Sequence, residues 1–301
     1  MVATAAALCF VARLPTTRVR CHTAVLAPVM MGTAATSALT LGPLLGSGTY
    51  GVVREAQWWS HGRLLDVVAK SARVSNPDDA AMAAEYLNVE ALVHEALEAK
   101  RQEDAVAMQA FCRFLGRVVA EGDVWLLWER LPGCDVSSRP LTLAQINQET
   151  GPTAGRDTID DATRHLSLAS FGLSPRVVLR QTLRAAHELH DRGFVHRDIK
   201  TANLLLSDNS LYLIDLGSCA QMAGCNLLDG WLGKCAGYDA SRSPCSPLFA
   251  PPERFVDPQH PFAFDVFSIG LVFLRLCWPS LLATDAQVAP AAVSDRALCL
   301  P

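Results

Sequence analysis

The feature that most constrains this chain is a group of charged and polar side chains held between apolar runs, in the stretch VHRDIKTANLLL that begins at Val195. Charged side chains are rarely set against buried segments unless they are paired or take part in chemistry. Transfer of a phosphoryl group to a hydroxyl requires an acceptor for the hydroxyl proton, a positive charge near the moving group and a ligand for Mg²⁺. Asp198, Lys200 and Asn203 match these three needs in that order. The alternative interpretation is an ordinary polar loop that follows a helix.

A second acidic position lies at the end of an apolar strand, in the stretch LYLIDLGSC, where Asp215 is followed by Leu216 and Gly217. Mg²⁺ in proteins prefers one or two carboxylates together with phosphate oxygens. A carboxylate at this position could therefore bind a Mg²⁺ ion shared with Asn203. This second site favours phosphoryl transfer over the polar-loop interpretation.

A glycine-rich stretch, GSGTYGVV, places Gly46, Gly48 and Gly51 in a GxGxxG spacing followed by Val53. A dinucleotide-binding fold requires a strand before these glycines and a helix after them. Here a strand pattern follows, so the glycines are predicted to form a hairpin whose backbone N–H groups face phosphates. Val53 would then pack on an adenine ring.

Lys70 ends the apolar strand DVVAK and needs a negatively charged partner unless it is simply exposed. The helix predicted at 79–100 contains several glutamates. Glu90 shares its helix face with apolar residues at helical spacing, whereas Glu95 and Glu98 are predicted to be solvent exposed. Glu90 is therefore the predicted partner of Lys70.

The N-terminal part of the chain is predicted to be rich in strands and the C-terminal part rich in helices. This order predicts two lobes with a cleft between them. Residues 132–172 and the stretch from about 217 to 250 are loop-rich. Strands are predicted within 40–70, near 111–119 and 124–129, and around 203–216; helices are predicted at 79–100, at 141–149, from Ser174 to Gly193, and at 264–278.

Composition limits the choice of partners and location. The 301 residues are 19% charged and 50% hydrophobic, which suits a chain with a substantial core, and the net charge of −4 does not favour nucleic acid as a partner. Residues 1–38 contain arginines but no acid, as chloroplast and mitochondrial transit peptides do; a secretory signal is the rival. The uncharged stretch at 24–45 is interrupted by Pro and Gly and overlaps the first predicted strand, so no membrane span is predicted.

Taken in order, these motifs resemble those of the eukaryotic protein kinases over residues 40–280. The resemblance implies an α+β, bilobal fold that binds ATP and Mg²⁺, with an N-lobe at 39–131 and a C-lobe at 132–301 that contains an insert at 132–172 and an activation segment at 215–253. It implies a glycine-rich loop of Gly46, Gly48 and Gly51, a Lys70–Glu90 pair, Asp198 as catalytic base, and Asn203 and Asp215 as metal ligands. Lys200 matches the serine/threonine type, and the hinge at 129–131 would bind adenine through backbone groups of Glu129 and Leu131.

The stretch DVWLLWERLPG, and DLG in place of DFG, resemble the thylakoid state-transition serine/threonine kinases of plants and green algae. This narrower resemblance implies a chloroplast location, in the stroma or on the stromal face of the thylakoid. It also implies a protein substrate, namely threonines of light-harvesting antenna or photosystem proteins. The resemblance implies membrane association, whereas this sequence shows no clear transmembrane helix. A pseudokinase or scaffold, and a soluble plastid kinase with other substrates, are the alternatives. The sequence does not predict an oligomeric state.

Several positions have structural interpretations as well. Only 23 residues follow Trp278, so we expect a shortened C-lobe in which Glu253 lacks its usual arginine partner unless Arg275 replaces it. Asp265 is predicted to be a helix cap or backbone anchor, and Trp128 a core residue or a wall behind the adenine. Three loop serines are phosphorylation candidates, with Arg197 as the residue that would bind the phosphate, and solvated loop serines are the equal alternative. Four cysteines are candidates for regulatory oxidation, and their spacing does not favour zinc binding. The serines are Ser241, Ser243 and Ser246, and the cysteines are Cys219, Cys225, Cys235 and Cys245.

Overall fold

The computed structural model describes residues 38–48, 51–72, 80–131, 141–146, 167–222, 246–253, 256–257 and 259–278. Residues 1–37 of the predicted leader and residues 223–245 of the activation segment lie outside this part, as do Ser241, Ser243, Cys225, Cys235 and Cys245. Among the described helices, none has the length and apolar character needed to cross a membrane.

The front of the chain folds into a five-stranded antiparallel sheet in the order β1-β2-β3-β5-β4. Its strands are β1 (Leu39–Gly48), β2 (Gly51–Ser60), β3 (Arg63–Ser71), β4 (Phe114–Ala120) and β5 (Asp123–Glu129). The prediction that a strand follows the glycines is confirmed. The predicted strand start at 111 is wrong, because the short 3-10 helix η2 (Ala107–Ala110) precedes β4 and ends in a bond from the Phe111 N–H to the Met108 carbonyl.

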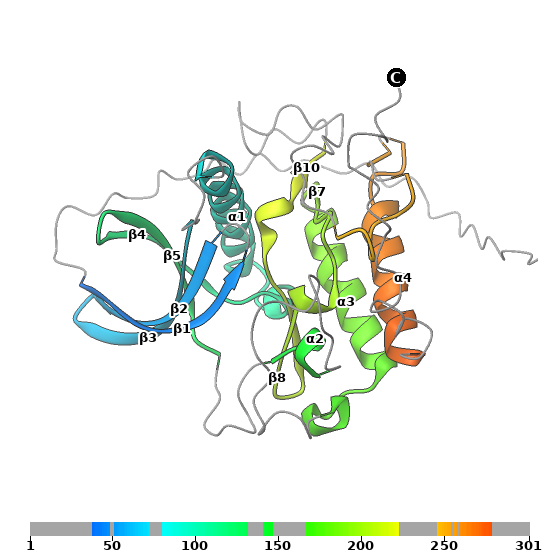
Figure 1. Cartoon of the computed structure of the whole chain (residues 1–301), viewed down its shortest axis with the longest axis horizontal. Coiled ribbons are helices and arrows are strands. Elements are labelled where there is room, and N and C mark those ends of the chain that lie inside the picture. Colours follow the sequence, from blue (N-terminus) through cyan, green and yellow to red (C-terminus); the bar gives the residue numbers. More distant parts are fainter. Residues whose placement is uncertain are drawn as a thin grey trace, which may run out of the picture.

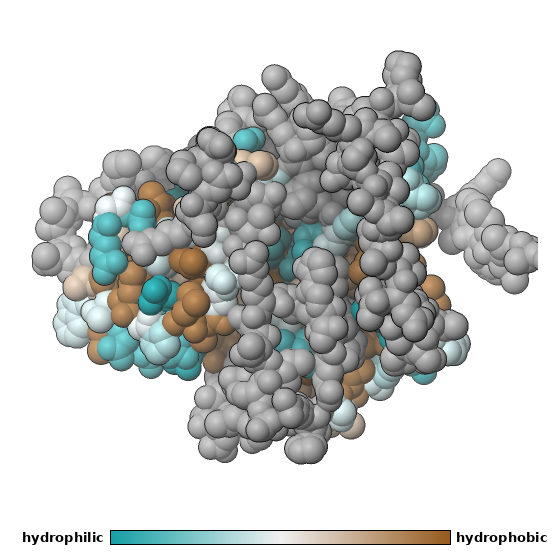
Figure 2. All heavy atoms as spheres, in the orientation of Figure 1, coloured by the Kyte–Doolittle hydropathy of each residue, from teal (hydrophilic) through white to brown (hydrophobic). Residues whose placement is uncertain are grey.

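Helix α1 (Ala80–Arg101) packs beside this sheet, between it and the helical part of the molecule (Figure 1). Its buried residues Leu87 and Ala91 form a cluster with Phe114, Leu126 and Trp128 of the sheet. Figure 2 shows one face of the molecule, on which hydrophobic and hydrophilic side chains are interspersed over the described sheet. The helix thus joins the sheet to the second lobe.

The back of the chain is built on helix α3 (Pro175–His190) and helix α4 (Ala263–Cys277), which lie side by side (Figure 1). The hydroxyl of Ser174 accepts a hydrogen bond from the Val177 N–H, so the predicted start of this helix at Ser174 is confirmed. The helix buries Val178, Thr182, Ala185 and Leu189 on its inner face.

Short elements complete this lobe around a core of apolar side chains from α3, α4 and the strands. Within the predicted loop-rich insert, the described residues form β6 (Leu141–Thr142), α2 (Leu143–Ile146) and the 3-10 helix η3 (Leu168–Phe171). Strands β6, β8 (Leu204–Ser207) and β9 (Ser210–Leu213) make one sheet, and β7 (Phe194–Val195) pairs with β10 (Ala220–Gln221). The predicted bilobal α+β architecture is confirmed.

Glu253 does not need the arginine partner that the sequence analysis looked for. Its side chain is exposed to solvent, so the penalty for an unpaired buried charge does not arise. The guanidinium of Arg275 instead lies 5.7 Å from the centre of the Phe249 ring.

Candidate active site

Lys70 joins the two lobes through charge. It stands near the end of β3, and its Nζ lies 2.7 Å from Glu90 Oε2 on α1. The same Nζ donates a hydrogen bond of 2.7 Å to Asp215 Oδ1, which follows β9 in the other lobe. The predicted pair therefore includes a third charged group that ties the sheet, α1 and the second lobe to one another.

The environment of these groups fixes their charges. Burial disfavours the charged form of Lys70, but the carboxylates of Asp215 and Glu90 outweigh it and hold the pKa of Lys70 above its usual value. The Lys70 ammonium lowers the pKa of Asp215 to about 2 against the effect of burial. Burial raises the pKa of Glu90, and the nearby ammonium opposes that shift.

Asp198 lies buried in the loop between β7 and β8, with 6% of its surface exposed. Its Oδ2 accepts hydrogen bonds from Lys200 Nζ at 2.7 Å and from Asn203 Nδ2 at 3.3 Å. Its Oδ1 accepts one from the backbone N–H of Ser246 at 3.1 Å. Burial raises the pKa of Asp198, and Lys200 opposes that shift. The structure thus brings together the three residues singled out in the opening motif.

Asp265, at the start of α4, anchors this loop, as the structural interpretation predicted. Its buried carboxylate accepts hydrogen bonds from the backbone N–H groups of His196 at 2.8 Å and Arg197 at 2.9 Å, and lies 2.8 Å from His190 Nε2. These bonds support a positive φ of 68° at Arg197, a conformation that few residues other than glycine adopt. Burial disfavours the Asp265 carboxylate, but its hydrogen bonds and the nearby histidines outweigh that effect and lower its pKa.

Asp215 sits at a sharp turn under α1, with φ 61° and ψ 64°. The 3-10 helix η5 (Leu216–Ser218) follows it, and a Cβ atom at Gly217 would lie 3.1 Å from the Tyr86 carbonyl oxygen. Glycine therefore permits the turn to lie close to the helix that carries Glu90. The Asp215 side chain remains 46% exposed, which leaves it accessible to a ligand.

Asn203 and Asp215 form a partial donor set for Mg²⁺. The amide nitrogen of Asn203 is used on Asp198, so its amide oxygen is the atom that can bind a cation. Oδ1 of Asp215 bonds Lys70, so Oδ2 is the oxygen it can offer. Among the described residues, no group of three or more His, Cys, Asp or Glu side chains could hold a metal alone. Asn203 and Asp215 therefore fit a Mg²⁺ ion whose remaining ligands are phosphate oxygens and water.

The glycine-rich hairpin lies next to Lys70. Gly48 pairs with Gly51 at its tip, Gly46 pairs with Val53, and Val53 is the cross-strand neighbour of Lys70. A Cβ atom at Gly51 would lie 2.6 Å from the Ser71 carbonyl oxygen, so a side chain there would displace the hairpin.

The residues assigned to the hinge lie at the C-terminal end of β5. Glu129 is the last residue of β5 and pairs with Val67 of β3, and its exposed carboxylate lies 3.7 Å from Arg113 Nη1. Arg130 forms an ion pair of 2.8 Å with Glu55 on β2, and Leu131 is half-buried. Glu129 lies three residue pairs along the β3–β5 pairing from Lys70.

Sequence reasoning missed His94, which lies one turn after Glu90 on the buried face of α1. Its Nε2 accepts a hydrogen bond of 3.1 Å from Trp128 Nε1, and its ring stacks on Phe114 with 5.3 Å between centres. Trp128 is 7% exposed, which confirms its interpretation as a core residue. The four-residue spacing from Glu90 was the signal that could have identified His94.

The prediction that Glu95 and Glu98 are solvated is wrong. Glu95 Oε1 accepts a hydrogen bond from Arg117 Nε at 3.0 Å, and its side chain is 22% exposed. Glu98 bonds both Arg101 and the Phe114 N–H and is 21% exposed. Arg117 and Phe114 lie on β4, and Arg101 lies one turn further along α1. The spacing of apolar residues on the helix did not indicate these partners.

The arrangement of these side chains is the one found in protein kinases. Lys70 pairs with Glu90 on a helix, Lys200 pairs with Asp198 in a loop, and Asp215 contacts Lys70 from the other lobe. The model of the protein kinase domain matches residues 39–291. The chain belongs to this family, and the predicted resemblance to the eukaryotic protein kinases is confirmed.

Curated relatives are similar over part of the chain. Over 120 residues it is 35% identical to "Serine/threonine-protein kinase STN7, chloroplastic" of Arabidopsis thaliana, a match that covers 35% of this chain and 21% of that protein. Over 130 residues it is 28% identical to "Serine/threonine-protein kinase STN8, chloroplastic" of the same plant, covering 36% of this chain and 24% of that protein. Serine/threonine-protein kinase STE20 of Eremothecium gossypii is 26% identical over 164 residues, which are 54% of this chain and 13% of that protein. The chain thus matches a quarter or less of the length of these relatives.

Proposed function

We propose that this chain is an ATP-dependent serine/threonine protein kinase. The observation that carries the proposal is the double contact of Lys70 Nζ, 2.7 Å from both Glu90 and Asp215. Kinases of this family require the lysine–glutamate pair and the metal-binding aspartate to be in place together. Membership of the family, and the three relatives with serine/threonine kinase names, support it.

In this proposal each residue has a separate task. Asp198 accepts the proton of the substrate hydroxyl, and its raised pKa makes it a better acceptor than an exposed aspartate. Lys200, 2.7 Å from Asp198, places positive charge where the phosphoryl group moves. Lys70 binds nucleotide phosphates, and Gly46, Gly48 and Gly51 bring backbone N–H groups to them.

The remaining groups hold the nucleotide and the metal. Asn203 and Asp215 would hold Mg²⁺, which supplies charge neutralisation at the phosphates when bound. Val53 would pack on the adenine, and the backbone of Glu129 and Leu131 would bond its edge.

The finer proposal is a chloroplast kinase acting on threonines of antenna or photosystem proteins, at the stromal face of the thylakoid or in the stroma. Its support is the similarity to two relatives whose names call them chloroplastic, together with the acid-free, arginine-containing start of the chain. A fluorescent protein fused after residue 40 tests the location: we expect plastid fluorescence, and a cytosolic signal would remove the basis for thylakoid substrates.

Activity is tested by incubating the purified chain with Mg²⁺, labelled ATP and a threonine-bearing peptide. We expect label in the peptide with the wild type and a loss of about a hundredfold or more for Asp198→Ala and Lys70→Ala. Equal labelling by wild type and variants would refute the assigned mechanism, and nucleotide binding without labelling would identify a pseudokinase. Isolated thylakoids test the substrate, because labelling of stromal proteins alone would contradict the antenna proposal and leave the kinase intact.

A further inference from the structure

The outer face of α3 carries a regular row of basic and apolar side chains that the proposed function does not use. Arginines recur every four residues along it, with a leucine before each of the second and third arginines and a histidine at the end. Most of these side chains are exposed, including Leu183 at 41%, and the row lies opposite the buried stripe of the helix. We call this surface the α3 stripe; it consists of Arg176, Leu179, Arg180, Leu183, Arg184 and His187.

The three arginines of the α3 stripe are unpaired within the described part of the chain. No acidic side chain is among the described residues that line the surface. Like charges four residues apart destabilise a helix, so this row does not serve the stability of α3. Three other arginines, in contrast, are bonded: Arg54 to the Gly42 carbonyl, Arg117 to Glu95, and Arg130 to Glu55.

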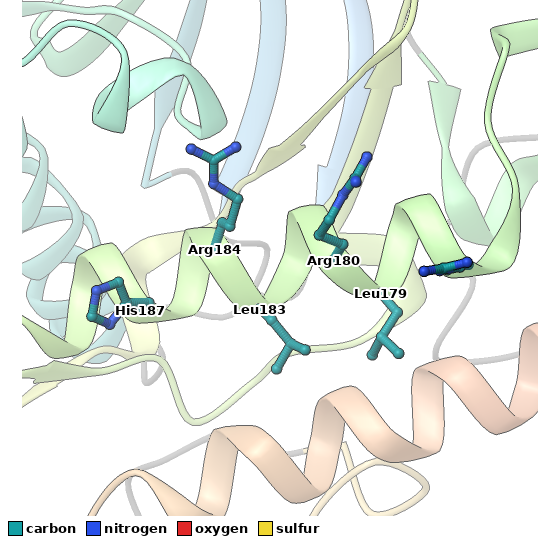
Figure 3. Close-up of a pocket in the computed structure, with 6 residues that line it drawn as sticks. Leu179, Arg180, Leu183, Arg184 and His187 are labelled. Carbon is teal, nitrogen blue, oxygen red and sulfur yellow. The ribbon is translucent and has the colours of Figure 1, made fainter. Parts of the chain in front are cut away.

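The two kinds of side chain diverge from the helix. Leu179 and Leu183 point toward the side of α4, whereas Arg180 and Arg184 point the other way (Figure 3). Neighbouring arginines of the row are about 6 Å apart along the axis, at 1.5 Å per residue. Alternate residues of an extended chain are about 6.6 Å apart, so acidic residues at every second position would meet the arginines in register. Carboxylates can bond arginine guanidinium groups through two parallel hydrogen bonds.

We propose that the α3 stripe binds an extended acidic segment of a partner protein, whose apolar side chains cover the exposed Leu183 and the part of Leu179 that does not pack against the core. The arrangement does not suit a bilayer, because interfacial helices bury their apolar face in the lipid and keep basic residues on the water side. In the α3 stripe the arginines are exposed opposite the buried face of the helix. Arg180 and Arg184 lie on the side away from α4, and the leucines lie on the side toward it (Figure 3). The arginines of the α3 stripe would thus set the register of the bound acidic segment. The leucines would favour a protein partner over a lipid headgroup.

Fluorescence anisotropy tests this surface with the full chain and a fluorescein-labelled peptide that alternates Glu with Leu and Ser. No nucleotide is added, so the result is independent of kinase activity. The double variant Arg180→Glu, Arg184→Glu removes two attractions and adds two repulsions, and we expect its Kd to rise about tenfold or more. Arg63→Glu is the matched control, since Arg63 on β3 is also exposed and unpaired among the described residues; its Kd should change by less than about twofold. Thermal unfolding by circular dichroism verifies that each variant is folded.

Each outcome decides the proposal. An unchanged Kd in the double variant would show that the peptide does not bind the α3 stripe, and an equal loss with Arg63→Glu would show attraction to overall charge; either result would overturn the proposal. Leu183→Ser should weaken binding several-fold at a salt concentration that leaves Arg63→Glu unaffected, and a peptide with Gln in place of Glu should not bind. Binding to phosphatidylcholine vesicles that contain phosphatidylglycerol, without binding to the peptide, would assign the stripe to lipid headgroups and refute a protein partner.

Discussion

The hydrogen bond from Trp128 to His94 gives a prediction that can be worked out in magnitude. His94 is 3% exposed, and burial, with Lys70 and Arg101 nearby, lowers its pKa to about 3 from an ordinary 6.5. Because Nε2 accepts the bond from Trp128, the neutral ring carries its proton on Nδ1, which finds no hydrogen-bond partner among the described residues. Protonating Nε2 would break the bond and bury a charge.

The folded protein should therefore lose stability in acid because of His94. Below pH 6.5 His94 is protonated in the unfolded chain, whereas in the folded chain it stays neutral down to about pH 3. The contribution of neutral His94 to the unfolding free energy is therefore complete at neutral pH and falls as the pH is lowered. One unit of pKa shift corresponds to about 1.4 kcal/mol, and the loss between pH 7 and pH 5 should be about 2 kcal/mol. Urea unfolding at a series of pH values measures it.

The matched control is the double variant His94→Leu, Trp128→Phe, which removes both polar groups. Its unfolding free energy should lack the His94 contribution, so the wild type should lose about 2 kcal/mol more than the control over this range. Each single variant leaves one buried polar group without its partner, at about 1–3 kcal/mol, whereas the double variant should lose less than the sum. Equal acid sensitivity of wild type and control, together with additivity within about 0.5 kcal/mol, would refute the reasoning.

Three further predictions concern the site itself. Asp265→Ala should lower the unfolding free energy by about 3–5 kcal/mol, because it leaves the N–H groups of His196 and Arg197 unbonded, and an unchanged urea midpoint would contradict this. Gly51→Ala should raise the KM for ATP about tenfold with a smaller change in kcat, since its Cβ would lie 2.6 Å from a backbone oxygen; steady-state kinetics checks it, and an unaltered KM would count against a phosphate-binding hairpin. Chelation of Mg²⁺ by EDTA should abolish peptide labelling and leave peptide binding to the α3 stripe intact, and labelling that survives chelation would exclude the role given to Asn203 and Asp215.

Features that depend on nearby residues could be predicted from the sequence. The apolar face of α1 singled out Glu90, and the strand after the glycines indicated a hairpin, because helical and strand periodicity are local properties. The helix start at Ser174 was predicted for the same reason. The order of the motifs indicated the bilobal fold, although no single motif was specific.

Features that depend on distant residues could not be predicted. Trp128 and His94 are 34 residues apart and meet only when α1 packs on β5. Glu95 looked solvated because its partner, Arg117, comes from β4. The positive φ of Arg197 has no local signal, since a tertiary contact with Asp265 supports it.

That contact has a consequence for protein synthesis. Asp265 follows His196 by 69 residues, so the ribosome completes the loop that contains Asp198 well before the residue that holds its backbone. At roughly 5–20 residues per second, the interval is about 3 to 14 s. The five-stranded sheet and α1 are complete earlier still and contain neighbours close in sequence. A nascent chain would therefore contain a folded front lobe while the loop of Asp198 is not yet anchored, and under the proposed function phosphotransfer would begin only when α4 docks.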